Sequence, residues 1–92
     1  MSEPIVLPAR LDPDAVATLA TDMRGAALCD TVQIDASAVM HLGALGAQLL
    51  LSTAKTAKTL GGRVSIVAIS DRARDQLAAM GLTPGEVEEG GA

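Results

Sequence analysis

The stretch from Thr31 to Gly62 constrains the fold most, because it places a short apolar strand directly before a long helix. Residues 31–35 alternate briefly between aliphatic and polar side chains, which predicts a strand. The helix is predicted from about Ala44 to Leu60, roughly four to five turns, and the glycines that follow it favour a left-handed cap. A strand that continues into a helix of this length is typical of an α/β fold with parallel strands.

The N-terminal flank adds one strand and one helix. Prolines at Pro4 and Pro8 remove backbone donors, so the apolar segment Ile5–Leu7 is predicted to be an edge strand. The pair Asp12-Pro13 is a strong helix start, and that helix is predicted to end near Ala26.

The C-terminal flank adds another strand and helix. Arg63–Ile69 is the clearest strand, and its nearly continuous aliphatic run indicates that both of its faces are covered. Ser70 is predicted to cap a last helix that Gly81 ends. After Pro84 the chain is predicted to fray, or to add a brief edge strand at Glu86–Glu88.

This order of elements predicts an α/β domain with a small mixed, mostly parallel β-sheet and packed α-helices. We expect one domain over residues 1–84 and an acidic, Gly-rich tail over residues 85–92. On the central helix, the 3.6-residue period predicts one buried and one polar face, with Leu51 exposed among the polar residues. The predicted core residues of this helix are Leu45, Leu49, Leu50, Thr53, Thr56, Ala57 and Leu60.

Composition excludes several classes of function. The chain is 49% hydrophobic but contains no aromatic residue, so it lacks the rings on which bases stack in many nucleic-acid-binding proteins. The net charge of −4 has the wrong sign for nucleic acid or an anionic membrane. We see no signal peptide and no membrane-spanning run, and a single cysteine, Cys29, cannot form an internal disulfide. These features predict a cytoplasmic protein that does not insert into a membrane.

The residues of acid–base, nucleophilic and metal chemistry are too few to form a site. One His and one Cys cannot supply a structural metal site, and there is no Gly-rich phosphate or dinucleotide motif. His41 has no acid or nucleophile at helical or strand spacing, so we interpret it as structural. Asp35 and Ser37, at a strand end, are expected to bond the next turn. We therefore predict no catalytic residue, no metal, no cofactor and no enzymatic activity.

Several short motifs together resemble those of the STAS domain, the fold of bacterial anti-sigma factor antagonists. They are Leu11-Asp12, the segment Ile34–Val39, Gly46 and Ala79–Leu82, and they keep the family's order from about Ile5 to Leu82. In regulated members, the second serine of an Asp-Ser-Ser-Gly-like motif is phosphorylated by a partner kinase. Here Leu45 occupies that position, so the resemblance implies a degenerate phosphosite. Only the motif's glycine is kept, as Gly46.

The resemblance implies a protein-binding regulator that docks on a histidine-kinase-like partner, either an anti-sigma factor or a chemotaxis kinase, without serine phosphorylation. The alternative is the cytosolic STAS subunit of a lipid-transporting ABC complex. A homodimer is compatible with both the kinase-binding hypothesis and the ABC-complex hypothesis. The docking surface implied by the resemblance lies on the connector and the first turns of the central helix: His41, Leu42, Gly43, Ala44, Ala47, Gln48 and Leu51.

Overall fold

The computed structural model describes residues 4–26 and 31–90, and Cys29 lies outside these ranges. Strands and helices alternate as predicted, with boundaries that move by one or two residues. The elements are β1 (Ile5–Val6), α1 (Pro13–Ala26), β2 (Thr31–Ala36), α2 (Gly43–Thr59), β3 (Arg63–Ile69), α3 (Asp71–Ala79) and α4 (Pro84–Glu88).

The three strands form one sheet in the order β1-β2-β3, and both neighbouring pairs run parallel. This confirms the predicted small, mostly parallel sheet. The ladder between β2 and β3 contains one irregularity: Ile34 pairs with Ile66, but the next residue, Asp35, pairs with Ala68. Val67 is therefore an extra residue, and such a bulge turns side chains away from simple alternation.

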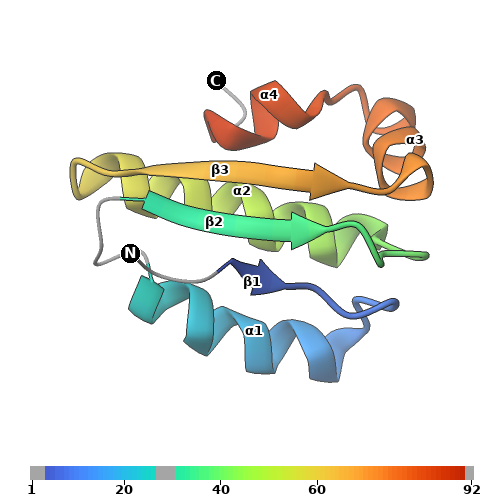
Figure 1. Ribbon diagram of the computed structural model, residues 1–92, viewed down its shortest axis with the longest axis horizontal. Helices are drawn as coiled ribbons and strands as arrows, with labels where there is room; N and C mark the ends of the chain where they lie inside the picture. Colours follow the sequence, from blue (N-terminus) through green and yellow to red (C-terminus); the bar gives the residue numbers. More distant parts are fainter. Residues whose placement is uncertain (1–3, 27–30, 91–92) are drawn as a thin grey trace.

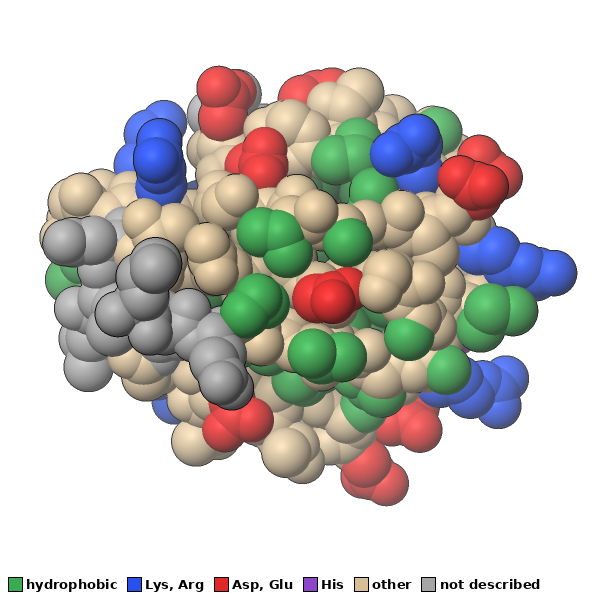
Figure 2. Space-filling view, in the orientation of Figure 1, with side chains coloured by type: hydrophobic (Ala, Val, Ile, Leu, Met, Phe, Trp, Pro, Cys, Tyr) green, Lys and Arg blue, Asp and Glu red, His purple; other side chains and the backbone are tan. Residues whose placement is uncertain are grey.

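α2 covers one face of the sheet, and no other described helix covers the opposite face of β2 and β3. α2 lies behind the strands in Figure 1 and contacts α1, β3 and α4. Within the described ranges, no helix lies in front of β2 and β3, and in the same view Figure 2 shows hydrophobic side chains around an acidic one. Val67 is 49% exposed. The prediction that both faces of β3 are covered is therefore wrong, because the bulge and the open face expose Val67 to solvent.

The core lies between the sheet and α2, and the buried face of α2 overlaps the predicted one but is rotated from it. Leu50, Thr53 and Ala57 are buried as expected, and Leu49 is half-buried. The other buried residues of α2 are small: Gly46, Ala47 and Ala54. Small side chains let a helix backbone approach the sheet closely, which is why they occupy the contact. The predicted core residues that are instead exposed are Leu45, Thr56 and Leu60.

The segment after Pro84 is a short helix rather than a frayed end or an edge strand. Thr83 caps α4 by accepting a hydrogen bond from Glu86 N at 3.1 Å, and Pro84 occupies the first turn. The side chain of Val87 is fully buried in the core. The fraying expected from the acidic and glycine content is wrong here, because one apolar side chain and one cap dock the helix.

Local capping agrees with the sequence elsewhere. Asp12 Oδ1 accepts from Ala15 N at 2.8 Å at the start of α1, and Ser70 Oγ accepts from Ala73 N at 3.1 Å at the start of α3. Gly61 and Gly81 have positive φ after α2 and α3, as left-handed caps require. Among residues 4–26 and 31–90, no helix is long and apolar enough to cross a membrane.

Candidate functional site

The connector between β2 and α2 is held by the segment that precedes α1. Met40 N and His41 N both donate to the carbonyl of Ala9, at 2.8 and 3.0 Å. Leu11 N donates to His41 O at 3.0 Å, and Arg10 and His41 form an isolated parallel bridge. These backbone contacts bring two segments that are distant in sequence side by side. His41 takes part in these contacts through its backbone, and the structural role predicted for its side chain stays a prediction.

A side chain from α3 caps the start of α2. Leu42, the residue before the helix, forms no capping bond through its own side chain. Instead, Gln76 Oε1 accepts from Leu42 N at 2.5 Å and from Gly43 N at 3.2 Å. Gln76 Nε2 also donates to Met40 O at 3.2 Å. One amide group therefore satisfies three backbone groups of the connector, and we identify Gln76 as a positioning residue that sequence reasoning missed.

A second bond links α3 to the connector. Ser70 Oγ donates to Val39 O at 2.5 Å while accepting from the first turn of its own helix. Val39 is itself buried. The connector is therefore fixed at both ends, and backbone groups that would otherwise be unpaired are bonded.

The two adjoining segments enclose an open groove of about 350 Å³. One wall is the entry to α1 and the other is the start of α2. Its lining residues are Arg10, Leu11, Asp12, Pro13, His41, Gly43, Ala44 and Leu45. The groove is within the size range of common small-molecule and side-chain pockets. Leu45, one of the lining residues, is 51% exposed.

The structure brings only part of the predicted docking surface to the protein surface. His41, Ala44 and Gln48 are exposed, and Gly43 is half-buried, with a left-handed φ of 69°. The ring of His41 lies close to Gly43, because a Cβ built on Gly43 would be 3.3 Å from His41 Nε2. Three of these four residues line the groove; Gln48 does not.

The remaining predicted surface residues are covered. Leu42 is 1% exposed and Ala47 is 3% exposed, so their side chains belong to the core. Leu51 is half-buried and packs against the core, so its predicted exposure is also wrong. The reason is the rotated face of α2, which turns Ala47 and Leu51 toward the interior and Leu45 outward.

The end of β2 carries a compact polar turn. Asp35 Oδ1 accepts from Ser37 N at 2.9 Å and from Ser37 Oγ at 2.6 Å, which confirms the predicted turn. These two bonds, the side-chain one first, hold the pKa of Asp35 below its ordinary value. The Ser37 hydroxyl is therefore engaged by a carboxylate. Among the described residues, no group of three His, Cys, Asp or Glu side chains could hold a metal ion.

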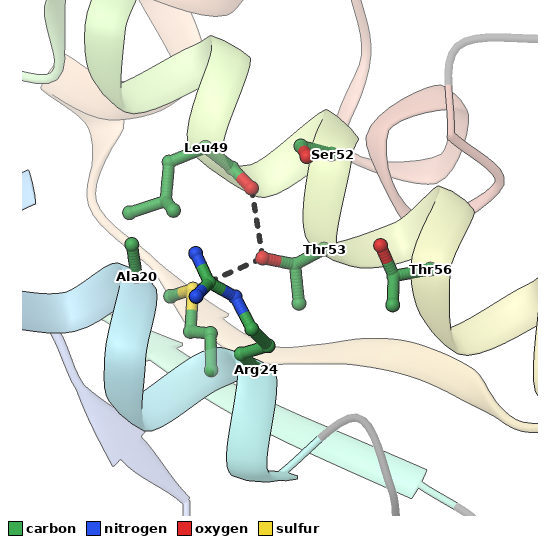
Figure 3. A pocket seen from close by; sticks show the side chains of 7 residues that line it. Ala20, Arg24, Leu49, Ser52, Thr53 and Thr56 are labelled. Carbon is green, nitrogen blue, oxygen red and sulfur yellow. Dashed lines mark hydrogen bonds between the residues drawn. The ribbon is translucent and has the colours of Figure 1, made fainter.

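A second, smaller cavity lies between α1 and α2 (Figure 3). Its volume is about 70 Å³, well below that of common ligand pockets. Thr53 Oγ1 donates to Leu49 O at 2.8 Å and lies 3.3 Å from the sulfur of Met23, while Arg24 extends beside it. None of the predicted docking residues lines this cavity, which we interpret as a polar seam between two packed helices.

Comparison with known families matches residues 3–84 of this 92-residue chain to the family described as Mlab, STAS domain. Searches of curated proteins and of solved structures give no match. The matched range includes the whole sheet, α1, α2, α3 and the groove, and it ends at the first residue of α4. The chain therefore belongs to the STAS domain family.

Proposed function

We propose that this STAS domain is a non-catalytic regulator that binds a histidine-kinase-like protein, an anti-sigma factor or a chemotaxis kinase, in the cytoplasm. Its docking surface is the rim of the groove together with the next turn of α2: His41, Gly43, Ala44, Leu45 and Gln48. Domains of this family are typically binding domains rather than enzymes, which supports a role in protein recognition.

One observation carries the proposal. Leu45 is a large apolar side chain that is half exposed in the first turn of α2, beside an open groove. An exposed apolar side chain held by a helix beside a groove is suited to a protein interaction surface. The groove can in turn receive an apolar side chain from the partner.

The absence of a hydroxyl at position 45 supports a second part of the proposal, which concerns regulation of binding. A phosphoserine there would add a charge of roughly −1.5 to −2 and repel or reorder a docked partner. Leucine cannot be modified in that way. We therefore propose that binding is constitutive or is controlled on the partner.

The experiment compares two exposed leucines at opposite ends of the same helix. Leu45 is 51% exposed at the start of α2, and Leu60 is 55% exposed at its C-terminal cap. The tagged wild type, Leu45→Glu and Leu60→Glu are purified by affinity from the native cells, and co-purifying proteins are identified by mass spectrometry. Circular dichroism verifies that both variants fold.

We expect a histidine-kinase-like protein with the wild type and with Leu60→Glu, and a loss of at least about tenfold with Leu45→Glu, as for an interface hot spot. Equal recovery with both variants would contradict the docking surface. Recovery of an ABC ATPase that depends on Leu45 would favour the alternative, a cytosolic subunit of a lipid-transporting complex. Recovery of no protein partner at all would contradict a binding module.

A further inference from the structure

The face of the sheet turned away from α2 has no covering layer among the described residues. Figure 1 shows no described helix in front of β2 and β3, although all three strands run parallel. Sheets made only of parallel strands occur almost exclusively with both faces covered. The nearly continuous aliphatic run of β3 also has the composition of a strand that is buried on both sides. This face is therefore the place on the fold where a partner can supply a further layer.

The register of the strands shows which side chains share this face. Val6 pairs with Asp35, and Asp35 pairs with Ala68 on the other side. Paired residues of neighbouring strands project to the same side of a sheet, and successive residues of one strand project to opposite sides. Ile34 and Ala36, on either side of Asp35 in the chain, are buried in the core. Asp35 and its two partners therefore form one row across the open face.

This row is apolar except for one carboxylate. Val6 is 65% exposed, and Val67, the extra residue of the bulge, is half exposed. Figure 2 shows the arrangement as an acidic side chain over the sheet with hydrophobic side chains around it. The only other charged residue in the three strands is Arg63, which pairs with Thr31, four residues or about 13 Å along β2 from Asp35. The row itself therefore carries a negative charge and no positive one.

The carboxylate of Asp35 is held in place and still has an oxygen to offer. Its Oδ1 accepts both bonds from Ser37, one from the hydroxyl and one from the backbone amide. These bonds, the hydroxyl first, lower the pKa of Asp35, so the group is ionised at neutral pH. Within residues 4–26 and 31–90, Oδ2 accepts no hydrogen bond. A carboxylate has about four lone-pair sites, so Oδ2 is free to accept from a cationic donor.

We propose that the open face is a second docking surface, for a protein segment that places one Arg or Lys side chain on Asp35 and apolar side chains on Val6 and Val67. Charge complementarity selects this occupant. A purely apolar segment would bury the ionised carboxylate without a partner, which is costly, and an acidic segment would be repelled. An Arg or Lys side chain has an apolar stem and a charged head, and it therefore matches both parts of the row. The surface shares no residue with the docking surface proposed around Leu45.

The test uses two synthetic peptides that differ in one charge. The first, Ser-Val-Leu-Arg-Leu-Val-Ser with blocked termini, carries one arginine between apolar residues, and the second has neutral citrulline in place of the arginine. Asp35→Asn removes the charge of the protein but keeps an oxygen for the bonds from Ser37, and Val67→Thr exchanges a methyl group for a hydroxyl. Asp22→Asn removes an equal charge from an exposed residue of α1 as a control. NMR titration of the labelled protein gives both the residues affected and the dissociation constant.

The arginine peptide should shift the amide signals of Val6, Asp35 and Val67 and leave that of Leu45 unchanged. Removing the charge from either side, with the citrulline peptide or with Asp35→Asn, should weaken binding at least about tenfold, as for loss of a hydrogen bond between charged groups. Val67→Thr should weaken it about fourfold, the factor for one buried methyl group. Asp22→Asn should not alter it.

Equal affinity of the wild type for the two peptides would overturn the proposal, as would the absence of shifts on this face at any peptide concentration. Shifts centred on Leu45 would also overturn it, and would leave the docking surface on α2 intact. If Asp35→Asn fails to fold, the comparison of the two peptides on the wild type decides alone.

Discussion

Adding one methyl group at Gly46 tests how closely α2 lies against the rest of the core. Gly46 is buried in the first turns of α2, and a Cβ built there would be 2.7 Å from Leu11 Cδ1 and 2.9 Å from Leu42 Cδ1. Both leucines are buried, so neither side chain can move freely out of the way. A side chain at position 46 would therefore collide with the core.

The expected magnitude is the difference between two opposing effects. Replacing a glycine within a helix by alanine stabilises the helix by about 1 kcal/mol. Inserting a methyl group into a packed core costs about 1–3 kcal/mol. The free energy of unfolding of Gly46→Ala should therefore fall by about 0–2 kcal/mol relative to the wild type.

Gly25, in the last turn of α1, provides the control, because a Cβ built there would meet no atom of the described residues within 4 Å. Gly25→Ala should raise the free energy of unfolding by about 0.5–1 kcal/mol. Urea unfolding followed by circular dichroism measures both variants, and the difference between them isolates the packing cost. If Gly46→Ala stabilises the protein as much as Gly25→Ala does, the close approach of α2 to Leu11 and Leu42 is refuted.

Three other outcomes follow from the site. Gln76→Ala should lower the free energy of unfolding by about 1–3 kcal/mol, because two backbone donors at the start of α2 lose their acceptor, and urea unfolding checks it. In Ser37→Ala, the pKa of Asp35 measured by NMR should rise toward 3.8. The turn stabilises the folded protein above the unfolded-state pKa of Asp35, and this stabilisation is lost as pH falls through the folded-state pKa. This pH-dependent part of the free energy of unfolding should be smaller in the variant. Incubation with an anti-sigma-type serine kinase and ATP should leave the intact mass unchanged, and a phosphate mapped to Ser37 or Ser52 would contradict constitutive binding.

Local signals predicted most of the fold. Asp12-Pro13, Ser70 and the glycines after the helices act through bonds to residues a few positions away, so the sequence alone is enough to recognise them. The aliphatic runs predicted the strands, and the alternation of strands with helices predicted that the sheet is parallel. The family resemblance drawn from short motifs is confirmed by the match over residues 3–84.

The features that the sequence did not predict depend on contacts between distant segments. Gln76 caps a helix whose start lies 33 to 34 residues earlier, and no spacing rule relates the two. α4 was missed because its stability comes from the burial of Val87 and the bond from Glu88 to β3, whereas its composition is that of a solvated tail. The groove likewise lies between two segments, distant in sequence, that are joined by the bridge between Arg10 and His41 and by the backbone bonds beside it.

The choice of the buried face on α2 also depends on contacts between distant segments, and it gives the adjacent residues Leu45 and Gly46 different surroundings. The helical period predicts Leu45 inside, but α2 packs closely against Leu11 and Leu42 at Gly46, and so Gly46 and Ala47 are buried while Leu45 is exposed. Adjacent residues should therefore give opposite results. Leu45→Glu should abolish partner recovery with little change in the free energy of unfolding, because exposed positions usually contribute within about 0.5 kcal/mol. Gly46→Ala should lower that free energy. If Leu45→Glu instead lowers the free energy of unfolding by well over about 0.5 kcal/mol, position 45 belongs to the core and the docking surface must lie elsewhere.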